Sequence, residues 1–136
     1  MSLERSQQVT VDPDYYAPYA ISQGIRTGNL VFISGQAGIT SDGQTVQGGF
    51  EAQARQVLAN ISNVLVNSGS SLADVVKVTI HVTDMSHLDT IIALRKEFFT
   101  EPYPADTLLQ VAGLAQRDWM IEIDAVAQVP PAANQL

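Results

Sequence analysis

Cysteine is absent from this chain of 136 residues, and basic residues are scarce. Without cysteine the protein has no disulfide, no thiolate nucleophile and no cysteine-ligated zinc site, which fits a reducing compartment. The chain has seven lysines and arginines and fourteen aspartates and glutamates, which gives a formal net charge of −7 at pH 7. Because nucleic-acid surfaces neutralise phosphates with clustered lysine and arginine, this balance argues against a nucleic-acid partner.

Long apolar runs are also missing from the sequence. No stretch approaches the length of a membrane span, and residues 1–8 lack the apolar segment of a secretion signal. We therefore expect a cytoplasmic protein without membrane contact. The two histidines, His81 and His87, have no partner at a metal-ligating spacing, so we predict no metal site.

The spacing of apolar residues predicts one domain over residues 17–129, with an N-terminal arm at 1–16 and a C-terminal tail at 130–136. Strands are expected at 21–26, 30–34, 76–83, 107–111 and 120–129. One helix runs from residue 50 to a glycine cap at Gly69, and a second, over 86–100, begins with a capping box of Ser86 and Asp89. The order β-β-α-β-α-β-β predicts an α+β fold with both helices on one face of a mixed sheet.

The second face of this sheet is expected to carry mixed side chains. Over 76–83, Val76, Val78, Ile80 and Val82 alternate with Lys77, Thr79, His81 and Thr83. In the last predicted strand the side chains of Glu122 and Asp124 share the polar side. A face that is neither fully charged nor fully apolar is expected to be covered in part by another subunit.

The segment LVFISGQ at 30–36 couples a strand-forming apolar run to a small polar end. Two interpretations of that end stay open. The hydroxyl of Ser34 and the exposed backbone at Gly35 would let a ligand come close. Alternatively, Gly35 marks a bulge and Ser34 satisfies nearby backbone groups.

Six blocks of the chain carry a family resemblance. They are APY at 17–19, LVFISGQ at 30–36, AQARQVLANI at 52–61, DVVKVTIHVTDM at 74–85, EFFTEPYPA at 97–105 and IEIDAVA at 121–127. In this order and spacing they resemble the RidA family (reactive intermediate deaminase; YjgF), also known as L-PSP endoribonuclease-like proteins. The resemblance implies a homotrimer of chorismate-mutase-like subunits with small-molecule clefts between neighbours. It also implies hydrolysis of reactive enamines and imines to 2-oxoacids and ammonia without a metal or cofactor.

The resemblance assigns site residues one position at a time. Tyr19 stands at the family's tyrosine, Ser34 at its strand-end serine and Glu122 at the glutamate that positions or activates water. The family's substrate-binding arginine falls on Asp106, and its frequent cysteine falls on Leu108. The predicted catalytic residues are therefore Glu122 and Ser34, and the predicted substrate-binding residues are Tyr19, Gly35, Asp106 and Thr107.

The aspartate at position 106 changes the expected chemistry, because a carboxylate accepts hydrogen bonds where an arginine donates them. If Asp106 and Glu122 share a cleft, the site favours a cation, an amine or a polar neutral ligand. In the alternative interpretation Asp106 caps a turn after Pro104. The sequence therefore predicts a deaminase with altered substrate preference or, alternatively, a non-catalytic binding trimer. Endoribonuclease activity fits the acidic balance least.

Overall fold

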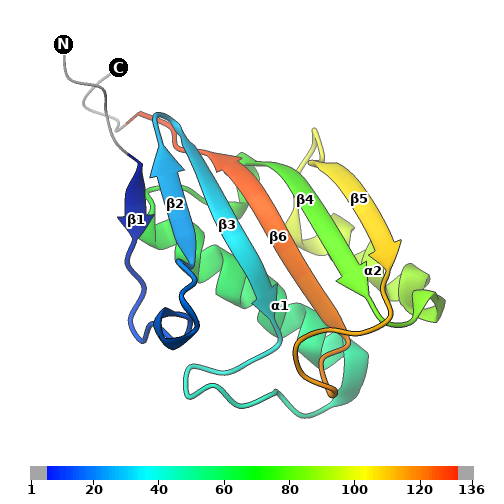
Figure 1. Ribbon diagram of the computed structural model, residues 1–136. Coiled ribbons are helices and arrows are strands. Elements are labelled where there is room, and N and C mark those ends of the chain that lie inside the picture. Colours follow the sequence, from blue (N-terminus) through cyan, green and yellow to red (C-terminus); the bar gives the residue numbers. More distant parts are fainter. Residues whose placement is uncertain (1–5, 132–136) are drawn as a thin grey trace.

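A mixed sheet of six strands carries two α-helices on one of its faces (Figure 1). The computed structural model describes residues 6–131. In chain order the elements are β1 (Gln7–Val9), β2 (Gly24–Thr27), β3 (Leu30–Ala37), α1 (Gly49–Asn67), β4 (Val75–Val82), α2 (Leu88–Phe98), β5 (Ala105–Gln110) and β6 (Ile121–Gln128). Short 3-10 turns lie at Ala17–Tyr19, Leu72–Asp74 and Met85–His87. The predicted α+β fold is confirmed.

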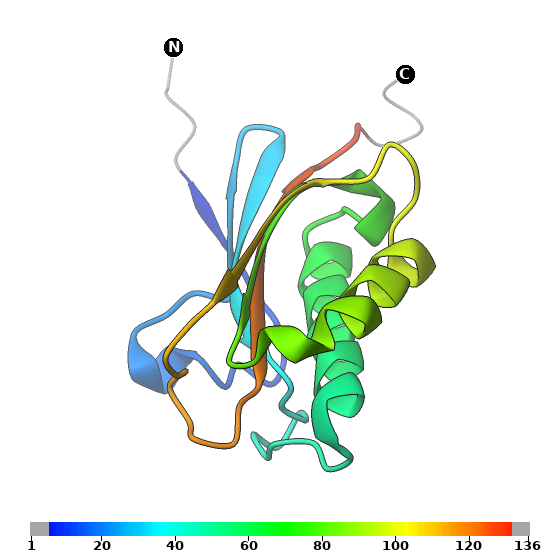
Figure 2. The ribbon, with the colours of Figure 1, turned by 90° about the vertical axis from the view of Figure 1, so that its right-hand side faces the viewer.

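The strands lie in the order β1-β2-β3-β6-β4-β5. β4 and β5 pair in parallel and α2 forms the crossover between them, whereas the other pairs are antiparallel. Figure 2 shows both helices on one side of the sheet and the 3-10 turn at 17–19 on the other. β5 is an edge strand, so it and the adjacent helix α2 lie at one edge of the sheet.

The strand β1 was not predicted from the sequence. Its residues, Gln7, Gln8 and Val9, are too few and too polar to show an alternating pattern, yet they pair with β2. Part of the predicted arm at 1–16 therefore belongs to the sheet. Residues 1–5 of that arm and 132–136 of the predicted tail lie outside the described residues.

The hydrophobic core lies between the sheet and α1. Helix α1 buries an aliphatic stripe at the predicted spacing, formed by Ala54, Val57, Leu58, Ile61, Val64 and Leu65. The strands contribute the opposing layer, which includes Val31, Ile33, Val78, Ile80, Ile121, Ile123 and Ala125. Each large aliphatic side chain buried here contributes about 1.5–3 kcal/mol to the stability of the fold. This packing holds the central strands β3, β6 and β4 in place. The sheet face opposite the helices is called the open face below.

Of the two predicted helix caps, the one at Gly69 is confirmed and the one at Ser86 is wrong. Gly69 has a φ of 81°, and the next amide, of Ser70, donates to the Leu65 carbonyl oxygen at 2.8 Å, so the glycine terminates α1 as predicted. The capping box expected from Ser86 and Asp89 does not form. Instead the carboxylate of Asp84 accepts a hydrogen bond from the Ser86 amide at 2.9 Å. A 3-10 turn fills the expected start of the helix, and α2 begins only at Leu88.

The alternation predicted for β4 fails at its first position. The pairing with β6 shifts register between Val75 and Lys77, so Val75 is buried and Val76 is exposed. An extra residue of this kind reverses the facing of the side chains before it. From Val78 onward the prediction holds, because Val78, Ile80 and Val82 are buried.

The sheet face opposite the helices carries polar and apolar side chains, as predicted. Phe32 and Leu109 keep 46% and 45% of their surface exposed in the single chain. The Nζ atom of Lys77 donates to Thr107 Oγ1 at 2.6 Å across β4 and β5. None of the helices within residues 6–131 has the length and apolarity that a membrane crossing requires.

Candidate functional site

The polar end of LVFISGQ lies at a β-bulge. The register between β3 and β6 shifts between Ile33 and Gln36, which leaves Ser34 and Gly35 outside the regular pairing. At Gly35 a Cβ atom would lie only 2.6 Å from Oε1 of Glu122. No residue with a side chain fits there unless the carboxylate moves. The bulge interpretation is therefore confirmed, and the group that approaches the glycine most closely is the predicted catalytic carboxylate.

Glu122 lies on the open face, because its neighbours Ile121 and Ile123 point into the core. The carboxyl group is half-buried, and its burial raises its pKa above the ordinary value. The nearby His81 partly offsets this rise in pKa, and Asp124 adds to it. No group within residues 6–131 donates a hydrogen bond to the carboxylate, so its oxygens are available to water or a ligand.

His81 is the cross-strand neighbour of Glu122. The two residues are paired between β4 and β6, and the Nδ1 atom of His81 lies 3.2 Å from the backbone oxygen of Glu122. The imidazole thus has a hydrogen-bonding role toward the strand that carries the carboxylate. This contact gives His81 a structural role beside the strand that carries Glu122.

Tyr16 was not singled out in the sequence, although the charge of Glu122 acts on its hydroxyl group. Its side chain is buried, and its hydroxyl donates a short hydrogen bond to the Gly35 carbonyl oxygen. Burial raises the pKa of Tyr16, and the charges of Tyr15 and Glu122 raise it further. A group of three tyrosines at 15, 16 and 19 was the only sequence signal. We call Tyr16, Gly35, His81 and Glu122 the Glu122 corner.

Among residues 6–131, neither Ser34 nor Tyr19, the other predicted site residues on this side, forms a hydrogen bond with the Glu122 carboxylate. The Ser34 hydroxyl donates to the Ser22 carbonyl oxygen at 2.5 Å, so this side chain satisfies local backbone, as the alternative interpretation expected. Its oxygen retains lone pairs that can still accept a hydrogen bond. Tyr19 lies on the 3-10 turn at 17–19, and 72% of its surface is exposed. In the single chain Tyr19 is therefore available to a ligand or a second copy.

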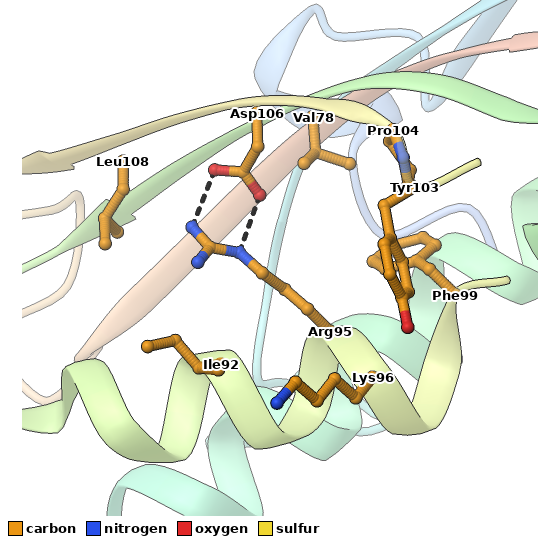
Figure 3. Close-up of a pocket in the computed structure, with 9 residues that line it drawn as sticks. All are labelled: Val78, Ile92, Arg95, Lys96, Phe99, Tyr103, Pro104, Asp106 and Leu108. Atoms are coloured by element: carbon orange, nitrogen blue, oxygen red, sulfur yellow. Dashed lines mark hydrogen bonds and ion pairs between the residues drawn. The ribbon is translucent and has the colours of Figure 1, made fainter. Parts of the chain in front are cut away.

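The predicted binding residue Asp106 lies elsewhere, in a pocket between α2 and β5 that we call the α2–β5 pocket (Figure 3). Its carboxylate binds Arg95 of α2 through both oxygens, at 2.8 Å from Nε and 2.8 Å from Nη2. Asp106 therefore does not cap a turn. Thr107, the next residue, points to the open face toward Lys77.

The structure separates the predicted site residues into two groups. Gly35 contacts Glu122 on the open face, whereas Asp106 faces α2 on the helix-covered face. Within a single chain Asp106 and Glu122 do not share a cleft. No three potential metal-ligating side chains of residues 6–131 lie close enough together to hold an ion.

Comparison with known proteins identifies the family of this chain. The family model for endoribonuclease L-PSP matches residues 10–129, which span the sheet and both helices. The chain belongs to the RidA family, also called the L-PSP endoribonuclease family. A RutC family protein of Pyrococcus horikoshii is 40% identical over 116 residues, covering 85% of this chain and 90% of the archaeal one.

Two further RidA relatives connect the family to a reaction and to a fold. The human 2-iminobutanoate/2-iminopropanoate deaminase is 36% identical over 116 residues, covering 85% of this chain and 82% of that protein. The crystal structure of RidA from an Antarctic Psychrobacter species superposes with a TM-score of 0.75 at 34% identity, covering 89% of this chain and 93% of that one. The predicted family membership is thus confirmed, and relatives of this RidA-family chain are named as deaminases.

Proposed function

We propose that this protein hydrolyses small reactive imines and enamines as a homotrimer, with its cleft between neighbouring copies. Membership of a family whose human relative is named as an iminoalkanoate deaminase supports the reaction class. The observation that carries the proposal is the Glu122 carboxylate. It is half-buried, its pKa is raised by burial, and no group of residues 6–131 donates a hydrogen bond to it. A carboxylate in this state is suited to take and return a proton.

The reaction needs one water molecule and no external oxidant or reductant. An enamine first tautomerises to the imine, and the oxygen of a water held by Glu122 adds to the imine carbon. The carboxylate accepts a proton from that water and delivers it to the nitrogen, which gives a carbinolamine. The carboxylate then transfers the hydroxyl proton of the carbinolamine to its amino group. The C–N bond breaks, ammonia leaves and the C=O bond forms. Ser34 and Tyr19 are proposed to supply polar contacts to the substrate.

The separation of the two groups of residues supports a shared cleft. The Glu122 corner lies on the open face, and the α2–β5 pocket lies beside an edge strand on the other face. The open face exposes Phe32 and Leu109, which a neighbouring copy would cover. In the proposed trimer, the corner of one copy and the pocket of the next form one site, as the family resemblance implies.

The reaction is tested by replacing Glu122 with glutamine, which keeps the shape of the side chain but cannot accept the proton. Imines are generated in situ, imino acids by an amino-acid oxidase and imines without a carboxylate by an amine oxidase, and the hydrolysis of both is followed against semicarbazide trapping. Glu122→Gln is expected to lower kcat/KM about 100-fold or more. The matched control is Asp124→Asn, which removes a second carboxylate from the same face and should retain activity within a few-fold. Equal loss in both variants, or no hydrolysis by the parent protein, would favour the non-catalytic binder.

The shared cleft is tested by complementation between two inactive variants. Glu122→Gln disables the corner, and Leu108→Trp fills the pocket. If each site takes its corner and its pocket from different copies, trimers reassembled from an equal mixture contain about one intact site in four. Activity should therefore recover to about a quarter of the parent level. No recovery in mixed trimers, verified by native mass spectrometry, would place both groups in the site of one chain.

A further inference from the structure

The α2–β5 pocket has the size of a small-molecule site but an unusual distribution of charge. Its cavity volume is about 440 Å³, within the usual range for pockets that enclose small ligands. Most of its wall is apolar or aromatic, formed by Val78, Ile92, Phe99, Tyr103 and Leu108. The predicted site position Asp106 therefore opens onto a largely hydrophobic space, and Figure 3 shows its carboxylate turned toward α2.

Arg95 and Asp106 neutralise each other inside this pocket. Both carboxylate oxygens accept from the guanidinium, at 2.8 Å from Nε and at 2.8 Å from Nη2. The two side chains are only 28% and 20% exposed, so water screens the pair incompletely. This two-point geometry is the one in which an arginine usually holds the carboxylate of a ligand. Asp106 thus occupies the position on Arg95 that a substrate carboxylate would take.

A carboxylate ligand entering the pocket meets two obstacles. It must compete with a group that is already fixed next to the guanidinium, and it must approach the negative charge of Asp106. The other cation at the pocket is Lys96, whose side chain is exposed and therefore strongly hydrated. An uncharged ligand meets neither obstacle and gains contact with the apolar wall.

We propose that the Arg95–Asp106 pair makes this protein selective for imines that carry no carboxylate and have an apolar or aromatic substituent. The proposal rests on the proposed function, because it names the substrate class of that same site. The pair is the specificity-determining element, and the substituent lies against the apolar wall of the pocket. Products of this class are aldehydes and ketones rather than 2-oxoacids.

The kinetic test compares two imines made in the assay. A flavin amine oxidase releases benzaldimine from benzylamine, and an amino-acid oxidase releases an imino acid from 2-aminobutanoate. The parent protein is expected to favour benzaldimine in kcat/KM by about 10-fold or more, the range of one lost charged hydrogen bond. Asp106→Ala should shift the ratio toward the imino acid by a similar factor. The double variant Arg95→Met/Asp106→Ala should remove that shift.

A binding test separates this inference from the reaction itself. The affinity of 2-oxobutanoate is measured by calorimetry for the parent, for Asp106→Ala and for the double variant. Asp106→Ala should bind about 10-fold more tightly than either of the others. Arg26→Met is the matched control, because Arg26 is exposed on the hairpin and bonds only the Gly28 carbonyl oxygen among residues 6–131. Its affinity should equal that of the parent.

The outcomes of the two tests are distinguishable. If the parent hydrolyses no imine but Asp106→Ala gains 2-oxobutanoate binding through Arg95, the proposed reaction fails and the selectivity of the pocket stands. If the parent hydrolyses imino acids as fast as benzaldimine and binds 2-oxobutanoate as tightly as Asp106→Ala, the reaction stands and the selectivity is overturned. A gain in Asp106→Ala that persists in the double variant would assign carboxylate binding to another cation, such as Lys96, and also overturn it.

Discussion

Glu122 and Asp106 are two carboxylates on opposite faces of one sheet, and their surroundings differ in almost every respect. Glu122 receives no hydrogen bond from residues 6–131, and burial raises its pKa. Asp106 is bound through both oxygens to Arg95. One carboxylate is thus kept ready to exchange a proton, whereas the other is neutralised by a fixed cation.

The difference shows that the neighbour, rather than the residue type, determines what a carboxylate does. Next to Glu122 the fold places Gly35, which allows the backbone to approach without supplying a charge. Opposite Asp106 it places a guanidinium on the facing helix. Changing either neighbour should therefore alter the function of the carboxylate while the carboxylate itself stays in place.

The largest effect is expected from Gly35→Ala. The added Cβ would lie 2.6 Å from Oε1 of Glu122, so the carboxylate must shift. A displacement of about 1 Å commonly lowers catalytic rates about 100-fold, and we expect a loss of that size in kcat/KM for imine hydrolysis. The matched control is Gly113→Ala, because a Cβ at Gly113 meets no atom within 4 Å. Similar rates for Gly35→Ala and the parent would remove Glu122 from the chemistry.

A smaller effect is expected from Tyr16→Phe. The substitution removes the hydroxyl that donates to the Gly35 carbonyl oxygen, and it leaves that oxygen without this donor. The free energy of unfolding should fall by about 1–2 kcal/mol, and kcat/KM should fall about 10-fold as the bulge loosens. Tyr15→Phe is the comparison, because the Tyr15 hydroxyl bonds the Gln36 side chain instead. An equal loss of activity in both variants would indicate general loosening rather than support of Gly35.

The pH profile tests how His81 affects Glu122. A carboxyl group with a raised pKa becomes protonated at a higher pH than an ordinary glutamate, so kcat/KM should fall early as the pH is lowered. His81 lowers the pKa of Glu122, and its removal in His81→Leu should move this fall to still higher pH. His87→Leu is the control, because His87 stacks on Phe50 at 4.0 Å, away from the corner. A profile unchanged in His81→Leu would contradict the coupling.

Sequence reasoning predicted the fold well because its main signals are local. The stripe of α1 and the final strand depend on spacings of three to four residues or of two residues, and both elements appear within two residues of their expected bounds. The short strand β1 was not predicted because it is stabilised by pairing with β2 and has no alternating pattern of apolar residues of its own. The start of α2 was misplaced because a 3-10 turn and an N-terminal capping turn share the same residue preferences.

The site was predicted less completely, since its key contacts join residues far apart in the sequence. Arg95 lies three residues after Ile92 and four before Phe99, so helical spacing puts it on the same side of the second helix as these apolar residues. A charged residue on such a stripe needs a partner across the core, and this signal was available. What the sequence does not contain is the register that places Asp106 opposite it. For Tyr16, no sequence pattern distinguishes it from Tyr15 and Tyr19.

The smallest effects concern stability, and here the two carboxylates should differ in sign. A raised pKa means that folding holds the proton on Glu122 more tightly than the unfolded chain does, so the charged form destabilises the fold above that pKa. Glu122→Gln should therefore raise the free energy of unfolding at pH 7, and the gain should vanish as the pH falls and the parent glutamate becomes protonated.

For the other carboxylate, Asp106→Asn leaves Arg95 without its ion partner, so the free energy of unfolding at pH 7 should fall by about 1 kcal/mol or less. Urea unfolding at pH 7 and at pH 4 measures both variants against the parent. Destabilisation by Glu122→Gln at pH 7 would mean that the corner holds its carboxylate by favourable contacts, and the contrast between the two faces would no longer stand. If Glu122→Gln raises the free energy of unfolding and Asp106→Asn lowers it, the Glu122 carboxylate destabilises the fold and the Asp106 carboxylate stabilises it. This is the behaviour expected of a catalytic group and of a neutralised one.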